Sequence, residues 1–85
     1  MRSENKYLKW EDLDFANPQR IYVLIDNKLY WVKYFYYEYR KVYQVYIYDN
    51  DTGRSVGFNQ RNIHLFNAIP MLIVNEEMVG EVHNE

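Results

Sequence analysis

The chain has 85 residues, a formal net charge of −2 and no cysteine, and ten of its residues are tyrosines. A chain of this length forms one small domain that buries roughly 60–65% of its unfolded surface, which leaves little room for a deep enclosed active site. Without cysteine the chain has neither a disulfide framework nor a thiolate metal site, so the packing of large aromatic side chains must hold the fold.

The sequence carries no sign of a membrane span, a secretory signal or a linker. Its longest apolar runs, such as residues 69–74, are too short to cross a bilayer, and the opening "MRSENKYLKW" lacks the apolar stretch of a signal peptide. No internal repeat and no Gly/Ser-rich or Pro-rich segment divides the chain. We therefore expect a cytoplasmic protein with one domain, residues 1–85, in which residues 75–85 form a mobile acidic tail.

Charge is distributed unevenly along the chain. Residues 16–74 hold seven Lys or Arg and four Asp or Glu, whereas residues 75–85 hold four Glu and no Lys or Arg. A mildly basic, aromatic middle is thus flanked by acidic ends, which weakens any nucleic-acid interpretation that the middle alone would favour.

The first half of the chain predicts a short N-terminal element followed by a β-hairpin. The segment "YLKWEDLDF" (residues 7–15) favours a helix, with a strand as the alternative. β-branched and aromatic residues then predict two strands, Ile21–Ile25 and residues 29–37. Asn27 can adopt the left-handed conformation that a tight turn requires, so the two strands are expected to pair.

The next segment predicts a second hairpin. "VYQVYIY" (residues 42–48) and "SVGF" (residues 55–58) are expected to be strands, because they are rich in residues that favour pleated sheet. The intervening "DNDTGR" concentrates turn-forming residues, among which Gly53 can take a positive φ angle.

After Phe58 the hydrophobic period changes to that of a helix. Apolar residues at Ile63 and Phe66 predict one to three helical turns, for which Asn59 or Asn62 is the expected cap. Pro70 ends this segment, and residues 71–74 predict a last strand. The expected fold class is α+β, mainly antiparallel β, either a small meander sheet or an SH3-like partly open barrel with one or two short helices.

Eight of the ten tyrosines fall between Tyr30 and Tyr48. Alternation along residues 29–37 and 42–48 puts large groups on both sides of both strands, although a small sheet has only one core to fill. These rings are cross-strand pairs that stabilise the sheet, an interface, or both at once, because the two uses are compatible. The residues predicted to bind a partner are Tyr34, Tyr36, Tyr37, Tyr39, Arg40, Lys41, Tyr46 and Tyr48.

Apparent catalytic and metal motifs lack the context that their chemistry requires. "GRSVG" (residues 53–57) matches a nucleophile elbow, but Ser55 follows a hairpin turn in a chain too short for the sheet that presents such a serine. "DNDTGRSVGFNQ" begins like a calcium loop and then lacks its glycine and its glutamate. His64 and His83 have no second ligand at zinc spacing. We therefore expect no enzyme activity, no cofactor and no metal.

Basic residues interleave with aromatic ones in a way that also suits single-stranded nucleic acid. Bases stack on such rings at about 1–3 kcal/mol each, while cations follow the phosphates. Lys33, Arg40, Lys41, Arg54 and Arg61 are the cations of this second hypothesis. The chain lacks an RNA-recognition signature and has too low an isoelectric point for a typical nucleic-acid-binding domain.

The opening "KYLKWEDLDF", a short sheet-forming body, an "LF" segment and an acidic tail resemble small uncharacterised proteins of phages and prophages of Gram-positive bacteria. The resemblance implies an accessory protein that binds and blocks a host protein, such as a CRISPR or other defence nuclease, by covering its surface. The leading hypothesis is thus a non-enzymatic protein-binding module whose partner is a host or phage protein. A single-stranded nucleic-acid binder and a structural subunit of a homo-oligomer are the alternatives.

Overall fold

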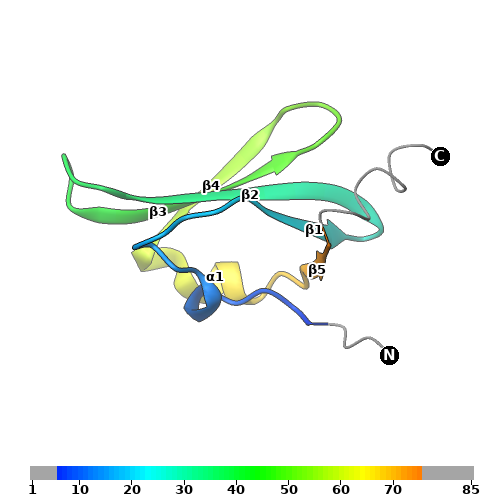
Figure 1. The fold of residues 1–85 in the computed structure, drawn as a ribbon, viewed down its shortest axis with the longest axis horizontal. Helices are drawn as coiled ribbons and strands as arrows, with labels where there is room; N and C mark the ends of the chain where they lie inside the picture. Colours follow the sequence, from blue (N-terminus) through cyan, green and yellow to red (C-terminus); the bar gives the residue numbers. More distant parts are fainter. Residues whose placement is uncertain (1–5, 76–85) are drawn as a thin grey trace.

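The computed structural model describes residues 6–75, which form one antiparallel sheet of five strands in the order β4-β3-β2-β1-β5. The strands are β1 (Ile21–Ile25), β2 (Lys28–Tyr37), β3 (Val42–Asp49), β4 (Ser55–Asn59) and β5 (Leu72–Val74). Two 3-10 helices, η1 (Trp10–Asp12) and η2 (Gln60–Asn62), and one α-helix, α1 (Ile63–Asn67), complete the elements. Figure 1 shows η1 and α1 on the same side of the sheet.

The β1–β2 hairpin is closed by a two-residue turn. Asp26 and Asn27 have φ angles of 54° and 65°, the left-handed pair that matches the twist of the strands in such a turn. Ile25 pairs with Lys28 across the turn, and the register runs to Ile21 opposite Val32. The two-residue loop therefore fixes which side chains of β1 and β2 share a face.

The turn from β3 to β4 is built around one carboxylate. The Asp49 side chain accepts hydrogen bonds from the backbone N–H groups of Asp51 (2.8 Å) and Thr52 (3.2 Å). Gly53 follows with a φ of 80°, a conformation that costs glycine least. This arrangement turns the chain into β4, whose Asn59 side chain then accepts from the Arg61 N–H to start η2.

The core lies between the sheet and the layer of helices. Val23, Val32 and Val45 are fully buried on the sheet side, and Leu8 and Phe66 are fully buried in the layer that covers it. The Phe66 ring meets Trp10 and Phe58 edge-on, at centroid distances of 5.5 and 5.8 Å. We call the covered side of the sheet the inner face and the opposite side the outer face.

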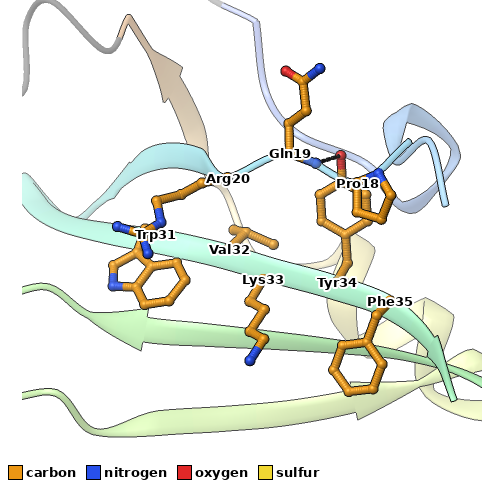
Figure 2. A pocket seen from close by; sticks show the side chains of 8 residues that line it. All are labelled: Pro18, Gln19, Arg20, Trp31, Val32, Lys33, Tyr34 and Phe35. Carbon is orange, nitrogen blue, oxygen red and sulfur yellow. Dashed lines mark hydrogen bonds between the residues drawn. The ribbon is translucent and has the colours of Figure 1, made fainter. Parts of the chain in front are cut away.

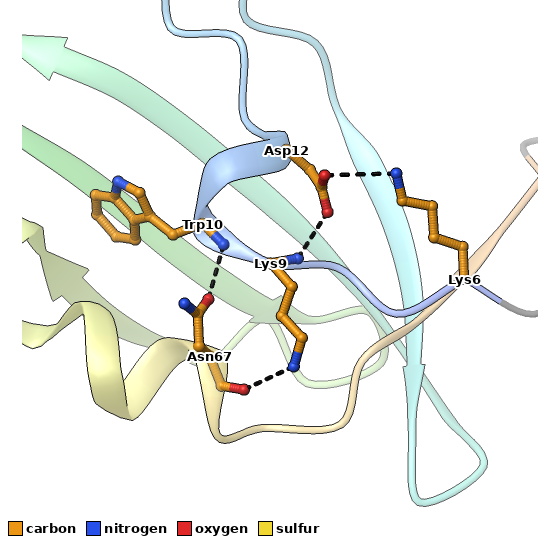
Figure 3. A network of polar contacts seen from close by, with 5 residues as sticks. All are labelled: Lys6, Lys9, Trp10, Asp12 and Asn67. Carbon is orange, nitrogen blue, oxygen red and sulfur yellow. Dashed lines mark hydrogen bonds and ion pairs between the residues drawn. The ribbon is translucent and has the colours of Figure 1, made fainter.

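The N-terminal segment is held in place by polar contacts at both ends (Figure 3). The Asn67 side chain accepts from the Trp10 N–H at 2.8 Å, and the Asn67 carbonyl accepts from the Lys9 ammonium at 2.9 Å. Farther back, the Leu8 N–H donates to Met71 and the Ile73 N–H donates to Lys6. The first described residues therefore also cover the exposed edge of β5.

The predicted fold class is confirmed, as an open sheet and not a closed barrel. Strand bounds agree to within one residue, Asn27 and Gly53 adopt the expected conformations, and α1 falls in the segment predicted for it. The N-terminal segment forms only a single turn of 3-10 helix. No helix among the described residues is long and apolar enough to cross a membrane. The acidic tail predicted beyond Asn75 lies outside the described residues.

We predict that Phe66→Ala lowers the free energy of unfolding by about 3–5 kcal/mol, because it leaves a cavity where the side chain is fully buried. Leu65→Ala is the matched control, since Leu65 is 61% exposed and should change stability by no more than about 0.5 kcal/mol. Urea unfolding followed by circular dichroism measures both. Equal losses in the two variants would contradict the placement of α1.

One ion pair joins the start of β2 to the end of β3. The Lys28 ammonium lies 2.8 Å from Asp49 Oδ2. The hydrogen bond from Lys28, followed by that from the Asp51 N–H, lowers the pKa of Asp49 to about 2, and the same pair raises the pKa of Lys28. Because the unfolded pKa of Asp is about 3.9, Asp49 stabilises the fold above that pH and loses this effect as the pH falls to about 2.

We predict that Asp49→Asn lowers the urea midpoint at pH 7, and that this difference from the unaltered protein disappears as the pH approaches 2. Asparagine keeps an oxygen for the two turn N–H groups but loses the ion pair. Midpoints at pH 7, 4 and 2 at constant ionic strength measure the effect, and Asp51→Asn, at an exposed position in the same turn, is the control. A difference that does not change with pH would show that the ion pair is not its source.

Candidate functional site

The central hairpin is longer than the strands on either side of it. β1 pairs with β2 only as far as Val32, and β4 pairs with β3 only from Gln44 onward. The cross-strand pairs Tyr36 with Tyr43 and Tyr37 with Val42 therefore have no third strand beside them among the described residues. Residues 36–43 project as a two-stranded arm beyond the layer of helices (Figure 1), and we call them the tyrosine arm.

The tyrosine arm exposes aromatic rings on both faces. Tyr39, in the turn, is 87% exposed, and the other three tyrosines are each about 40% exposed. Tyr36 and Tyr43 lie on the inner face with ring centroids 4.7 Å apart. Tyr37 lies on the outer face, and its ring centroid is 6.2 Å from that of Tyr39. These contacts between rings cover only part of the apolar surface of the arm, and the rest stays exposed.

Elsewhere on the outer face the aromatic rings pack against one another. Trp31 stacks on Tyr48 with centroids 4.4 Å apart, and the Arg20 guanidinium lies 3.9 Å over the Trp31 ring. Both partners of Trp31 are thus provided by the protein itself. Next along the face, the rings of Phe35 and Tyr46 lie nearly parallel, with their centroids 6.1 Å apart.

A glycine sets the position of the Tyr46 ring. A Cβ atom at Gly57, directly opposite on β4, would lie 2.8 Å from Tyr46 Cε1, so the ring leans over the glycine backbone. An aromatic ring that packs over a cross-strand glycine covers backbone that the glycine, having no side chain, leaves exposed. This part of the outer face therefore has a structural explanation.

A hollow of about 510 Å³ lies where the outer face meets the tyrosine arm. Two guanidinium groups, Arg40 and Arg61, belong to its lining, and neither forms an ion pair within the described part of the chain. No carboxylate of the described residues lines the hollow, and its other lining residues are Tyr37, Val42, Gln44, Tyr46 and Asn59. The hollow is therefore suited to an anionic group.

The structure brings most of the predicted partner-binding residues together. Tyr36, Tyr37, Tyr39, Arg40 and Lys41 all lie in the tyrosine arm, and Tyr46 lines the adjoining hollow.

Two predicted residues are placed elsewhere. Tyr34 is only 5% exposed, and its hydroxyl accepts a hydrogen bond from the Gln19 N–H at 3.1 Å, so its ring belongs to the core. Tyr48 belongs to the stack with Trp31. The arm and the hollow, rather than the whole set of tyrosines, form the candidate site.

Sequence reasoning missed two members of this site. Tyr43 shares the inner face with Val45 and Ile47 and is 40% exposed, although the Phe15 ring packs on it at a centroid distance of 4.8 Å. Arg61 was noted only as a cation of the middle segment, and it reaches the hollow because Asn59 at the end of β4 pairs with Gln44. The signal that could have found both is the length of β2 and β3 relative to their neighbours.

The described residues of the catalytic and metal motifs do not converge in the structure, and His83 lies outside the described residues. Ser55 begins β4 at an exposed position, and His64 is exposed in α1. The Asp49 carboxylate is held by Lys28 and by the turn. Within residues 6–75 no group of three or more His, Cys, Asp or Glu side chains could hold a metal ion.

No protein-family model matches this chain, and no curated protein or solved structure matches it.

Proposed function

We propose that the protein is a non-enzymatic protein-binding module that holds its partner through the tyrosine arm. The observation that carries the proposal is the exposure of Tyr36, Tyr37, Tyr39 and Tyr43 on a hairpin that no neighbouring strand supports. Tyrosine provides a large contact area with few rotatable bonds, and its hydroxyl stays hydrated until a partner covers it.

The two-sided arrangement favours a protein over a nucleic acid. A single strand of nucleic acid stacks its bases along one face of a sheet. Tyr36 and Tyr37 point to opposite faces, so a partner that covers both must enclose the arm in a groove. Surfaces of proteins can form such grooves around a hairpin, and tyrosine and arginine are common among residues that dominate binding energy there.

The resemblance of the N-terminal segment to small phage and prophage proteins selects the first partners to test. A host protein, blocked because the arm covers its working surface, is the partner that this resemblance implies. A bacterial defence nuclease is one member of that class.

A second candidate function, binding of single-stranded nucleic acid, is supported by the hollow. Arg40 and Arg61 line it together with Tyr37 and Tyr46, and its lining includes no carboxylate from residues 6–75. Such a site would hold a phosphate between the guanidinium groups with a base on a tyrosine ring.

We predict that Tyr37→Ala weakens binding of the partner by about 2 kcal/mol or more, roughly 30-fold in Kd, because Tyr37 belongs to both the arm and the hollow. The partner is first identified by affinity purification from the host and then titrated as a purified protein. Tyr7→Ala is the control, since Tyr7 is similarly exposed at 48% but belongs to the N-terminal segment beside β5.

Two outcomes would contradict the protein hypothesis. Equal affinities of the two variants would show that the arm is not the interface. Binding of a random single-stranded oligonucleotide that falls steeply with salt, and that is lost in the double variant Arg40→Glu with Arg61→Glu, would assign the hollow to nucleic acid.

A further inference from the structure

Within residues 6–75, one stretch of β2 has no neighbouring strand on the side of β1. The β1–β2 register ends with Ile21 opposite Val32, whereas β2 continues to Tyr37. On its other side β2 is paired with β3 along its whole remaining length, from Tyr30 to Tyr37. Residues 33–37 therefore present a free strand edge.

Alternation identifies which backbone groups face this edge. In an antiparallel sheet, successive residues direct their N–H and C=O groups to opposite neighbours. The Leu29 carbonyl accepts from the Asn50 N–H at 3.1 Å, so odd-numbered residues of β2 face β3. Tyr34 and Tyr36 consequently direct two N–H and two C=O groups toward the free edge.

The preceding chain does not cover these groups. Pro18 has no N–H to donate, and the Gln19 N–H turns to the side-chain hydroxyl of Tyr34 instead of to its backbone. Phe15 then packs edge-on against the Tyr34 ring at 5.3 Å, which takes the chain beneath the inner face. These contacts of the preceding chain are with the Tyr34 side chain and not with the backbone of β2.

A groove of about 370 Å³ runs along this edge (Figure 2). Its walls are residues 18–20 on one side and residues 31–35 of β2 on the other. Figure 2 shows Lys33 and Phe35 on one side of β2 and Tyr34 on the other, so an added strand would meet different chemistry on its two faces. Its charged lining residues are Arg20 and Lys33, and the described part of the chain contributes no carboxylate to it.

The other edges of the sheet offer less. The edge of β5 is bridged by Tyr7 opposite Leu72. β4 is the outer strand at the other end of the sheet, and its residues Ser55, Gly57 and Asn59 place small or polar side chains on the outer face, so a strand added there would bury little area on that face.

We propose that the free edge of β2 receives an extended acidic segment of the protein partner as an additional strand. The backbone of Tyr34 and Tyr36 would form the hydrogen bonds of the new ladder, as in other cases of strand addition. Residues of the segment opposite Lys33 and Phe35 lie on the outer face beside the cations, which selects Asp or Glu there. Residues opposite Tyr34 and Tyr36 lie on the inner face beside aromatic rings, which selects β-branched side chains.

This inference rests on the proposed function and specifies how the partner binds. The test uses the full chain labelled with ¹⁵N and a probe, the acetylated and amidated peptide Glu-Val-Glu-Val-Glu. We expect its addition to shift the amide signals of Tyr34 and Tyr36 and to slow their hydrogen exchange, because both become ladder donors. A peptide with proline at both valine positions and one with Lys in place of Glu should each bind at least about tenfold more weakly.

Two variants of Tyr36 distinguish the contribution of its backbone N–H to peptide binding from that of its ring. Tyr36→Pro removes an N–H that no strand of the sheet uses and should weaken peptide binding by about tenfold or more. Tyr36→Ala removes the same ring but keeps that N–H, so it should weaken peptide binding at least about threefold less than Tyr36→Pro does. If the proline variant does not fold, the proline-containing peptide gives the same information with the unaltered protein.

Several results would overturn the proposal. Unchanged Tyr34 and Tyr36 amides at millimolar peptide, equal binding of the Lys peptide, or shifts confined to β4 would each do so. Protection of these amides that grows with protein concentration alone would assign the edge to a second copy of the chain. None of these results would affect the comparison of Tyr37→Ala with Tyr7→Ala, so failure of the edge and failure of the arm remain distinguishable.

Discussion

The fold depends on burying one face of a single sheet under a very thin layer. Five strands supply the inner face, and within residues 6–75 it is covered by one short helix, two 3-10 turns and the N-terminal segment. Phe66 and Leu8, both fully buried, supply the centre of that layer. Among the described residues this layer is shorter than β2 and β3: it reaches Tyr43 through Phe15, and the rings of Tyr36, Tyr37 and Tyr39 stay exposed. The candidate site is a direct result of this difference in length.

The outer face carries aromatic residues without a covering layer, since nothing in residues 6–75 covers it as the helices cover the inner face. Aromatic residues there reduce their exposure by packing on one another and under long cationic side chains, as Trp31 does between Tyr48 and Arg20. Each such contact contributes about 0.2–1 kcal/mol to the sheet. The abundance of tyrosine thus has a structural cause over most of the sheet, and a binding role is needed only where the packing partners end.

Local pattern was enough to predict the strands and the face on which most side chains lie. The alternation of Val32 and Tyr34 against Trp31 and Phe35 is the alternation found, because a strand has no other way to present them. Asn27 indicated its turn because asparagine tolerates the left-handed conformation that such a turn requires.

Local pattern could not predict which side chains are buried, or which come together, where this depends on how far one element extends past its neighbour. Tyr34 and Tyr36 share a face and a residue type, yet one is in the core and the other is in the arm. Their difference is set by Phe15, which packs against Tyr34 from a distant part of the chain. Arg61 and Arg40 likewise come together through the register of β3 with β4, which a single sequence does not specify.

The turn at the tip of the arm has a consequence for how rigid the arm is before any partner arrives. Lys41 adopts a φ angle of 57°, in the left-handed region, where a residue with a Cβ atom is less stable by about 1–2 kcal/mol. Glycine would remove this strain, but it would also let the unbound tip sample many more conformations. A partner would then have to order the tip, at an entropic cost that reduces affinity. Lysine at this position therefore exchanges a little stability for a tip whose shape is restricted in advance.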